Sequence, residues 1–173
     1  MTPDAVTALL PVLGYAIVSI FTPGPNNITS SSLGMRVGYG RTLRFIAGVV
    51  TGFFVVMTLA GLLTEALVAA VQRAEVFLRV LGVAYLLWLA WMVIRPHQSE
   101  ATFGAGTRFV DGFLLQFVNV KVILFGITMY AALLTPWVQS PRTVFLSALG
   151  LSLLSFCSTS LWALLGAAIQ RFI

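Results

Sequence analysis

The sequence predicts an all-α polytopic membrane protein with five transmembrane helices, and three observations lead to this fold class. Of the 173 residues, 59% are hydrophobic and only 9% are charged, and the mean hydropathy is +0.99; a soluble domain carries far more charge. The apolar residues form five long runs joined by short connections, and each run has the roughly 17 to 25 residues, or somewhat more, that span a bilayer. The first run is interrupted by two prolines and a glycine.

The first hydrophobic segment covers residues 6–35 and is interrupted at 22–27, so we expect its helix to be broken at Pro23–Asn27. Each proline removes a backbone donor, and its ring clashes with the preceding turn. Such a break persists in a membrane only where it is buried in protein or lines a wet cavity. The amides of Asn26 and Asn27 follow at once, so the break is interpreted as a binding site. A compatible alternative is that both asparagines cap a half-helix beginning near Ile28.

The remaining segments complete a two-unit organisation. They cover residues 43–63, 76–94, 112–134 and 143–169. We predict a first three-helix unit at 1–94, a cytoplasmic loop at 95–111 and a second unit at 112–173 with two helices. The second unit is therefore incomplete: either a sixth helix is missing from this sequence or the protein is naturally short.

The first and fourth segments suggest an inverted repeat. Each has a glycine, then an apolar stretch, then a polar cluster with an asparagine, Asn26 in one and Asn119 in the other. Three crossings separate them, so the second copy would enter the membrane from the opposite face. In inverted-repeat transporters, interrupted helices at corresponding positions mark the substrate site. We therefore expect the Pro23–Asn27 break to lie close to Asn119.

The orientation follows from the cations in alternate loops, because cytoplasmic loops carry the excess of Lys and Arg. Six arginines fall on one side of the membrane, namely Arg36, Arg41, Arg44, Arg95, Arg108 and Arg171. Three fall on the other, namely Arg73, Arg79 and Arg142. The first and third loops are predicted to be cytoplasmic, which places the amino terminus on the outer, periplasmic side.

Lys121 is the one charged residue deep within a hydrophobic run. It lies about 13 Å along the helix from Gly112, near the middle of the bilayer, where a charged side chain is costly and indicates function. The alternative is a lysine that snorkels to an interface. Since no acidic residue lies within a hydrophobic run, we expect Lys121 to meet a substrate carboxylate or to lose its proton through burial.

Small residues at helical spacing predict helix packing rather than a functional role. GxxxG pairs are formed by Gly34 with Gly38 and by Gly48 with Gly52. Ser152, Ser155 and Thr159 share one face of the fifth segment and are expected to look inward, because lipid offers hydroxyl groups no partner.

Several classes of function are excluded by what the sequence contains. The one cysteine, Cys157, allows neither an internal disulfide nor the thiol relay of some membrane proteins. There is no His/Cys/Asp/Glu cluster for a metal, no phosphate loop and no nucleophile–base spacing. We therefore predict no enzyme and no cofactor. The net charge of +5 comes mostly from arginines in the loops, so it serves orientation and not nucleic-acid binding.

The chain resembles the lysine-exporter (LysE/RhtB) family of amino-acid exporters over nearly its whole length, and three stretches carry the resemblance. They are Pro23-Gly-Pro-Asn-Asn27 with the following Gly38-Tyr-Gly-Arg41, Leu81-Gly-Val-Ala-Tyr85 with the Leu-Leu-Trp-Leu after it, and Phe109 to Lys121. The chain departs from the family at Val120, where a proline is usual, so the second break is expected to be gentler. It also departs in having five helices where the family usually has six.

The resemblance implies a secondary transporter that exports amino acids or close derivatives across the bacterial inner membrane, driven by an ion gradient, most simply of protons. The substrate-binding residues that it implies are Pro23, Gly24, Pro25, Asn26, Asn119 and Lys121. The break adds Asn27 to this set. The expected partners are a small-molecule substrate and the lipid bilayer, and a homo-oligomer is left open. The alternative is a membrane scaffold or assembly subunit. A transporter should have a polar cavity where the breaks converge, whereas a scaffold should pack that region dry.

Overall fold

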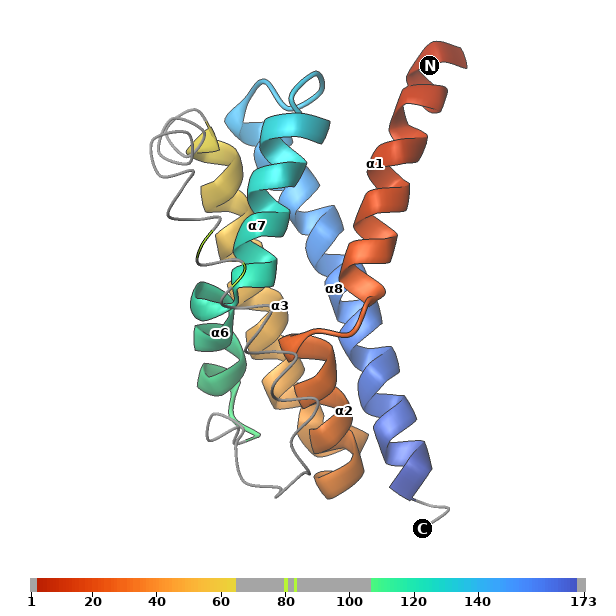
Figure 1. The fold of residues 1–173 in the computed structure, drawn as a ribbon. Coiled ribbons are helices and arrows are strands. Elements are labelled where there is room, and N and C mark those ends of the chain that lie inside the picture. Colours follow the sequence, from red (N-terminus) through yellow and green to blue (C-terminus); the bar gives the residue numbers. More distant parts are fainter. Residues whose placement is uncertain (1–2, 65–79, 81–82, 84–106, 171–173) are drawn as a thin grey trace.

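The computed structural model describes residues 3–64, 80, 83 and 107–170, and the regular elements of this part of the chain are all helices, without strands. Its elements are α1 (Pro3–Phe21), α2 (Pro25–Val37), α3 (Tyr39–Leu62), α6 (Phe109–Val118), α7 (Val120–Thr128), the π-helix η1 (Met129–Leu133) and α8 (Pro141–Gln170) (Figure 1). The predicted all-α fold is confirmed for these residues. The predicted third segment, 76–94, falls almost wholly outside them.

Two of the described helices, α3 and α8, are long and apolar enough to cross a membrane. The pair Phe109–Val118 and Val120–Leu133 qualifies as a third span if the two helices are taken as one bent unit, and α1 contributes a shorter apolar helix at Leu9–Phe21. Large apolar side chains also cover the outer surface, as Val18 shows with 67% of its surface exposed. Because water would penalise such a surface, it is suited to lipid.

The first break is shorter than predicted. Gly24 is the residue before α2, its backbone is extended, and Pro25 occupies the first turn. A proline there has its φ already set for a helix and lacks a donor that would be unpaired anyway. The prediction that the half-helix begins near Ile28 was therefore wrong. Asn26 and Asn27 lie inside the first turn of α2 and do not cap it.

The second break is sharper than predicted. Asn119 separates α6 from α7, and the two helices are bent by 61°. The expectation that Val120, in place of a proline, would make this break gentler was wrong. Asn119 has an extended backbone (φ −81°, ψ 96°), so the helix is interrupted without a proline. Figure 1 shows both breaks about halfway along the bundle, with α1 and α7 toward one end and α2 and α6 toward the other.

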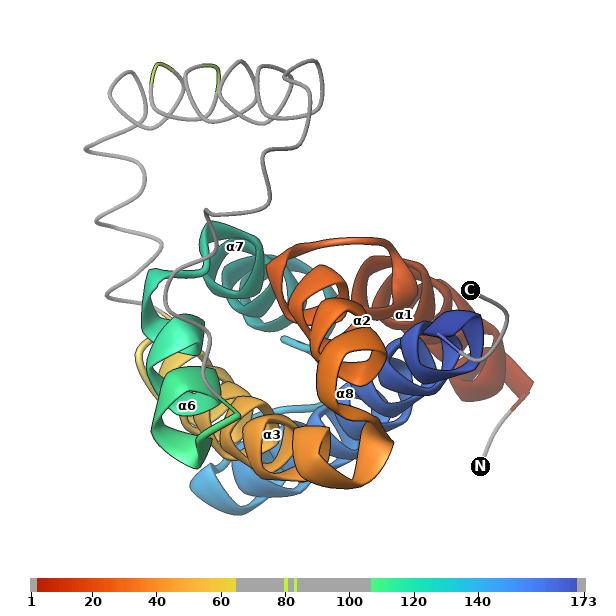
Figure 2. The same ribbon diagram turned by 90° about the horizontal axis from the view of Figure 1, so that it is seen from below.

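Glycines bring the helices together in two places. Gly34 on α2 faces α8, where Gly166 faces back, and a β-carbon at either would collide with a backbone carbonyl of the other helix. Gly48 on α3 and Gly112 on α6 form the second such pair (Figure 2). The packing role predicted for Gly34 and Gly48 is confirmed. It was wrong for Gly38, where an added β-carbon would meet nothing within 4 Å and which instead joins α2 to α3 at a positive φ of 79°.

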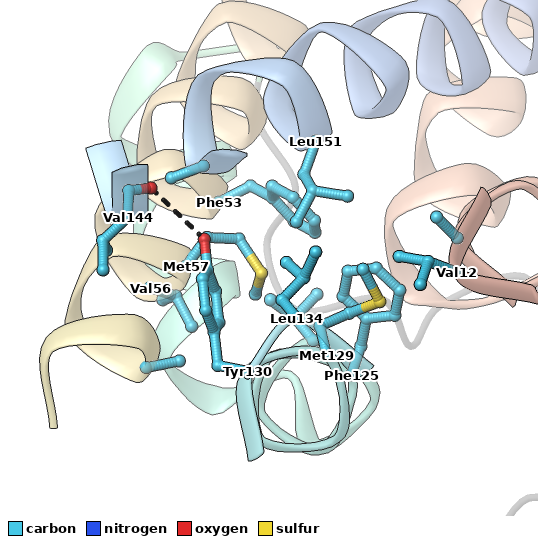
Figure 3. Packing of buried hydrophobic residues seen from close by; sticks show 14 residues of the cluster. Val12, Phe53, Val56, Met57, Phe125, Met129, Tyr130, Leu134, Val144 and Leu151 are labelled. Carbon is cyan, nitrogen blue, oxygen red and sulfur yellow. Dashed lines mark hydrogen bonds between the residues drawn. The ribbon is translucent and has the colours of Figure 1, made fainter. Parts of the chain in front are cut away.

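The apolar core lies on one side of the breaks, between α3, α7, η1 and α8, and α1 reaches it through Val12. Phe53 and Met57 of α3 meet Phe125 and Met129 there (Figure 3). The hydroxyl face of α8 is buried as well. Its residues Ser152, Ser155 and Thr159 are all at most 3% exposed. The prediction that this face looks inward is confirmed.

Candidate functional site

The two breaks meet directly although they are far apart in the sequence. Asn119 Nδ2 donates a hydrogen bond of 3.0 Å to Asn26 Oδ1. The contact confirms the predicted proximity of the first break to Asn119. Away from this point the broken helices pack elsewhere, α2 mainly against α8 and α6 mainly against α3. The α2–α8 pair and the α3–α6 pair therefore come into contact at the breaks.

Gln116, which the sequence reasoning overlooked, joins the two asparagines in an amide network. Its side chain is fully buried and pairs reciprocally with Asn26: Asn26 Nδ2 donates to Gln116 Oε1 at 2.8 Å, and Gln116 Nε2 donates to Asn26 Oδ1 at 3.1 Å. Gln116 Nε2 also donates to the carbonyl of Gly112 at 3.0 Å. The sequence did hold a signal, because a glutamine in an apolar run three positions before Asn119 places both amides on one side of the helix.

The last carbonyls of α1 lie at the break, where the helix itself offers them no donor. Side chains of α2 and α8 supply the donors. Asn27 Nδ2 and Ser158 Oγ both donate to Ile20 O at 2.9 Å. Trp162 Nε1 donates to Phe21 O at 3.1 Å. The end of α1 is thus held in place by groups from two other helices, which explains how an open helix end is tolerated at membrane depth.

Lys121 completes this arrangement at Thr22. Its Nζ donates a hydrogen bond of 2.8 Å to Thr22 O, which also accepts from Asn27 Nδ2 at 3.1 Å. A cation at the carboxyl end of a helix is favoured by the helix dipole. Among the described side chains, the ion pair is between Arg108 and Asp111 at the start of α6, and it does not involve Lys121. Within the described residues, the ammonium therefore donates to a carbonyl and pairs with no carboxylate.

A small cavity of mixed character lies between the breaks. Its volume is about 30 Å³, and its lining includes polar groups of both breaks together with the apolar walls Phe53, Val122 and Phe125. The full lining is Ser19, Ile20, Gly24, Pro25, Asn26, Asn27, Phe53, Asn119, Lys121, Val122, Phe125 and Ser155. A water needs about 10–15 Å³ of such space. The cavity therefore has room for one or two waters and is too small to hold any amino acid.

Residues 17–173 match the family model described as LysE type translocator. The chain belongs to the LysE-type translocator family. It is 36% identical to a cysteine/O-acetylserine efflux protein of Klebsiella pneumoniae, over 99% of this chain and 86% of that protein. Identity is 35% to the protein of the same description in Salmonella typhi and 33% to that in Escherichia coli K12, over 99% of this chain and 87% of each relative. No solved structure matches.

Family membership confirms the predicted resemblance and the prediction of a membrane transporter rather than an enzyme. The translocator's structure brings six of the seven predicted site residues to the cavity. The seventh, Pro23, is exposed and does not line it. Besides Gln116, sequence reasoning missed Ser158 and Trp162, because their contacts with the end of α1 depend on where α8 lies.

Proposed function

We propose that this translocator exports short polar amino acids of the cysteine and O-acetylserine class across the bacterial inner membrane, binding them in the cavity between the two breaks. The proposal rests chiefly on the convergence of polar groups from both broken helices, marked by the hydrogen bond between Asn26 and Asn119. A scaffold would have no use for three amides gathered at the breaks, namely Asn26, Gln116 and Asn119, since buried polar groups are costly. The descriptions of the relatives supply the substrate class.

The substrate carboxylate suits the first turns of α2 and α7. The leading N–H groups of a helix lack partners in the helix, and the dipole makes this end positive. Two such ends begin beside the cavity, at Pro25 and Val120. The Lys121 ammonium adds a full positive charge. Phe53 and Phe125 then face the short side chain of the substrate.

Transport requires the cavity to open, because its volume of about 30 Å³ excludes an amino acid. In the proposed cycle the unit containing α1 and α2 moves relative to the unit containing α6 and α7, and the site faces each side of the membrane in turn. The hydrogen bond from Lys121 to Thr22 joins the two units and must rearrange in each cycle. We assign proton coupling to Lys121, the titratable residue of the site, and we place the amino terminus in the periplasm.

Counterflow in proteoliposomes tests this function. Purified protein is reconstituted with internal unlabelled amino acid, and uptake of labelled cysteine, O-acetylserine, lysine and leucine is compared. Exchange is expected for the first two, and an imposed pH gradient should drive their net movement. Proteoliposomes that exchange no amino acid from the panel would overturn the proposal, and exchange without any response to pH would remove proton coupling from it.

A further inference from the structure

An acceptor at the breaks is left without a donor from the part of the chain that the structure describes. Asn119 is only 4% exposed, and its Nδ2 is used by Asn26. Its Oδ1 is buried and has no hydrogen-bond partner among the described residues. Buried polar atoms are normally paired, and an exception calls for an explanation in function or in an absent ligand.

The direction of this free oxygen is fixed by a relay of amides. The Gly112 carbonyl can only accept, so it holds the nitrogen of Gln116 toward itself, and the same nitrogen donates to Asn26 Oδ1. Gln116 Oε1 must then accept from Asn26 Nδ2. Because Asn26 presents its oxygen to Asn119, the amide of Asn119 turns its nitrogen toward Asn26 and leaves Oδ1 open. Each step follows from the donor and acceptor inventory of an amide.

The neighbouring helix α3 makes room for the relay. A β-carbon at Gly52 would stand 2.6 Å from the backbone oxygen of Phe113 and 2.8 Å from Cγ of Gln116, so any larger residue there would displace both α6 and the Gln116 side chain. Two positions after Asn119 lies Lys121, which also lines the cavity. Asn119 and Lys121 both line the cavity, so an acceptor that no described donor uses and a cation lie beside it, and they are complementary to the ammonium and the carboxylate of an amino-acid zwitterion.

We propose that Asn119 Oδ1 accepts a hydrogen bond from the α-ammonium group of the substrate, and that Gln116 is the positioning residue that keeps this oxygen free. The proposal rests on the proposed function and refines it. It distinguishes α-amino acids from carboxylic acids of the same shape, because an acid without the ammonium leaves Asn119 Oδ1 unpaired. One hydrogen bond to a charged group corresponds to a preference of about ten- to a hundredfold.

The experiment compares L-cysteine with 3-mercaptopropionate, which lacks only the α-ammonium group, as competitors of labelled cysteine counterflow under reducing conditions. The measured quantity is the ratio of the two inhibition strengths, cysteine over 3-mercaptopropionate. In the parental protein this ratio should be at least about ten. In Asn119→Leu this ratio should fall close to one, chiefly through weaker inhibition by cysteine. Gln116→Met has a side chain of similar length without the amide, so Asn26 and Asn119 can turn, and the ratio should fall as well. Ser152→Ala, whose hydroxyl bonds only within its own helix, should keep the parental ratio.

A parental ratio in Asn119→Leu overturns the assignment of the ammonium to Asn119. If that variant does not insert, the ratio of Gln116→Met decides, and a parental value there overturns the relay. If the parental protein itself shows a ratio near one, the inference is also overturned, while amino-acid export stands. Failure of the proposed function is distinguishable, since the parental protein would then show no counterflow at all.

Discussion

The side chain of Lys121 passes so close to Gly24 that a β-carbon at Gly24 would stand 2.9 Å from Lys121 Cδ and 3.0 Å from its Nζ. The backbone of Gly24 is extended, with φ −163°, a conformation that any residue adopts. The glycine is thus required for space and not for its conformational freedom. It leaves open the path along which Lys121 reaches the carbonyl of Thr22.

Gly24→Ala should therefore displace Lys121 without unfolding the protein. The displaced atoms belong to the end of a flexible side chain, so the helices need not move apart, but the hydrogen bond to Thr22 is lost. We expect cysteine counterflow to fall about tenfold, as one charge-assisted hydrogen bond corresponds to roughly 1.5–3 kcal/mol. Gly14→Ala, which has nothing within 4 Å of its added carbon, is the matched control. Equal rates in the two variants would show that the position of Lys121 is irrelevant.

Lys121→Met tests the charge itself. Methionine has nearly the same length and removes the ammonium, so counterflow should be abolished while the yield of protein in the membrane fraction is retained. Lys121→Arg keeps the charge but presents a planar fork of donors, and we expect it to retain a minor part of the activity. A parental rate in Lys121→Met would mean that the lysine only satisfies the carbonyl of Thr22.

Much of this fold could be predicted because membrane depth constrains the backbone strongly. Two prolines around Gly24 predicted a break, and the cost of unpaired backbone groups in lipid predicted that it would be covered. A lysine within an apolar run predicted a site at Lys121 by the same reasoning. These inferences depend only on local residues and on the general properties of a bilayer, so the sequence suffices for them.

The rest depended on contacts that no local pattern specifies. The absence of a proline at position 120 predicts a gentle bend, but the helices are bent by 61° at Asn119, where a tertiary hydrogen bond to Asn26 holds the break. The start of α2 was placed too late because Asn26 and Asn27 are good caps, although Pro25 can open a helix by itself. Gln116 was overlooked because its importance follows from the opposite helix, where Asn26 faces it.

The close approach of α3 and α6 gives a prediction on stability. A β-carbon at Gly48 would collide with the backbone carbonyl of Phe109, and backbone cannot yield as a side chain does. Gly48→Ala should lower the free energy of unfolding by about 1–3 kcal/mol, measured as thermal unfolding in detergent. Gly150→Ala on α8 meets nothing within 4 Å, so it should be neutral or stabilising by up to about 1 kcal/mol through helix propensity. The same loss in both would contradict the packing role of Gly48.

The end of α1 gives a last prediction, because its carbonyls differ in how many donors reach them. Among the described residues, Phe21 O accepts from Trp162 alone, whereas Ile20 O accepts from both Ser158 and Asn27.

Trp162→Phe keeps an aromatic ring and leaves Phe21 O without that donor, so the last turn of α1 should open more readily, at a cost of about 1 kcal/mol. Ser158→Ala should have a smaller effect, because Asn27 still serves Ile20 O. Hydrogen exchange of the amides in the last turn of α1 measures both, with faster exchange expected in the order Trp162→Phe, Ser158→Ala, parental protein. The control is Trp137→Phe, which removes a partly buried indole that packs against the core. Equal acceleration in that variant would show that lost ring packing, and not the hydrogen bond to Phe21, sets the stability of this helix end.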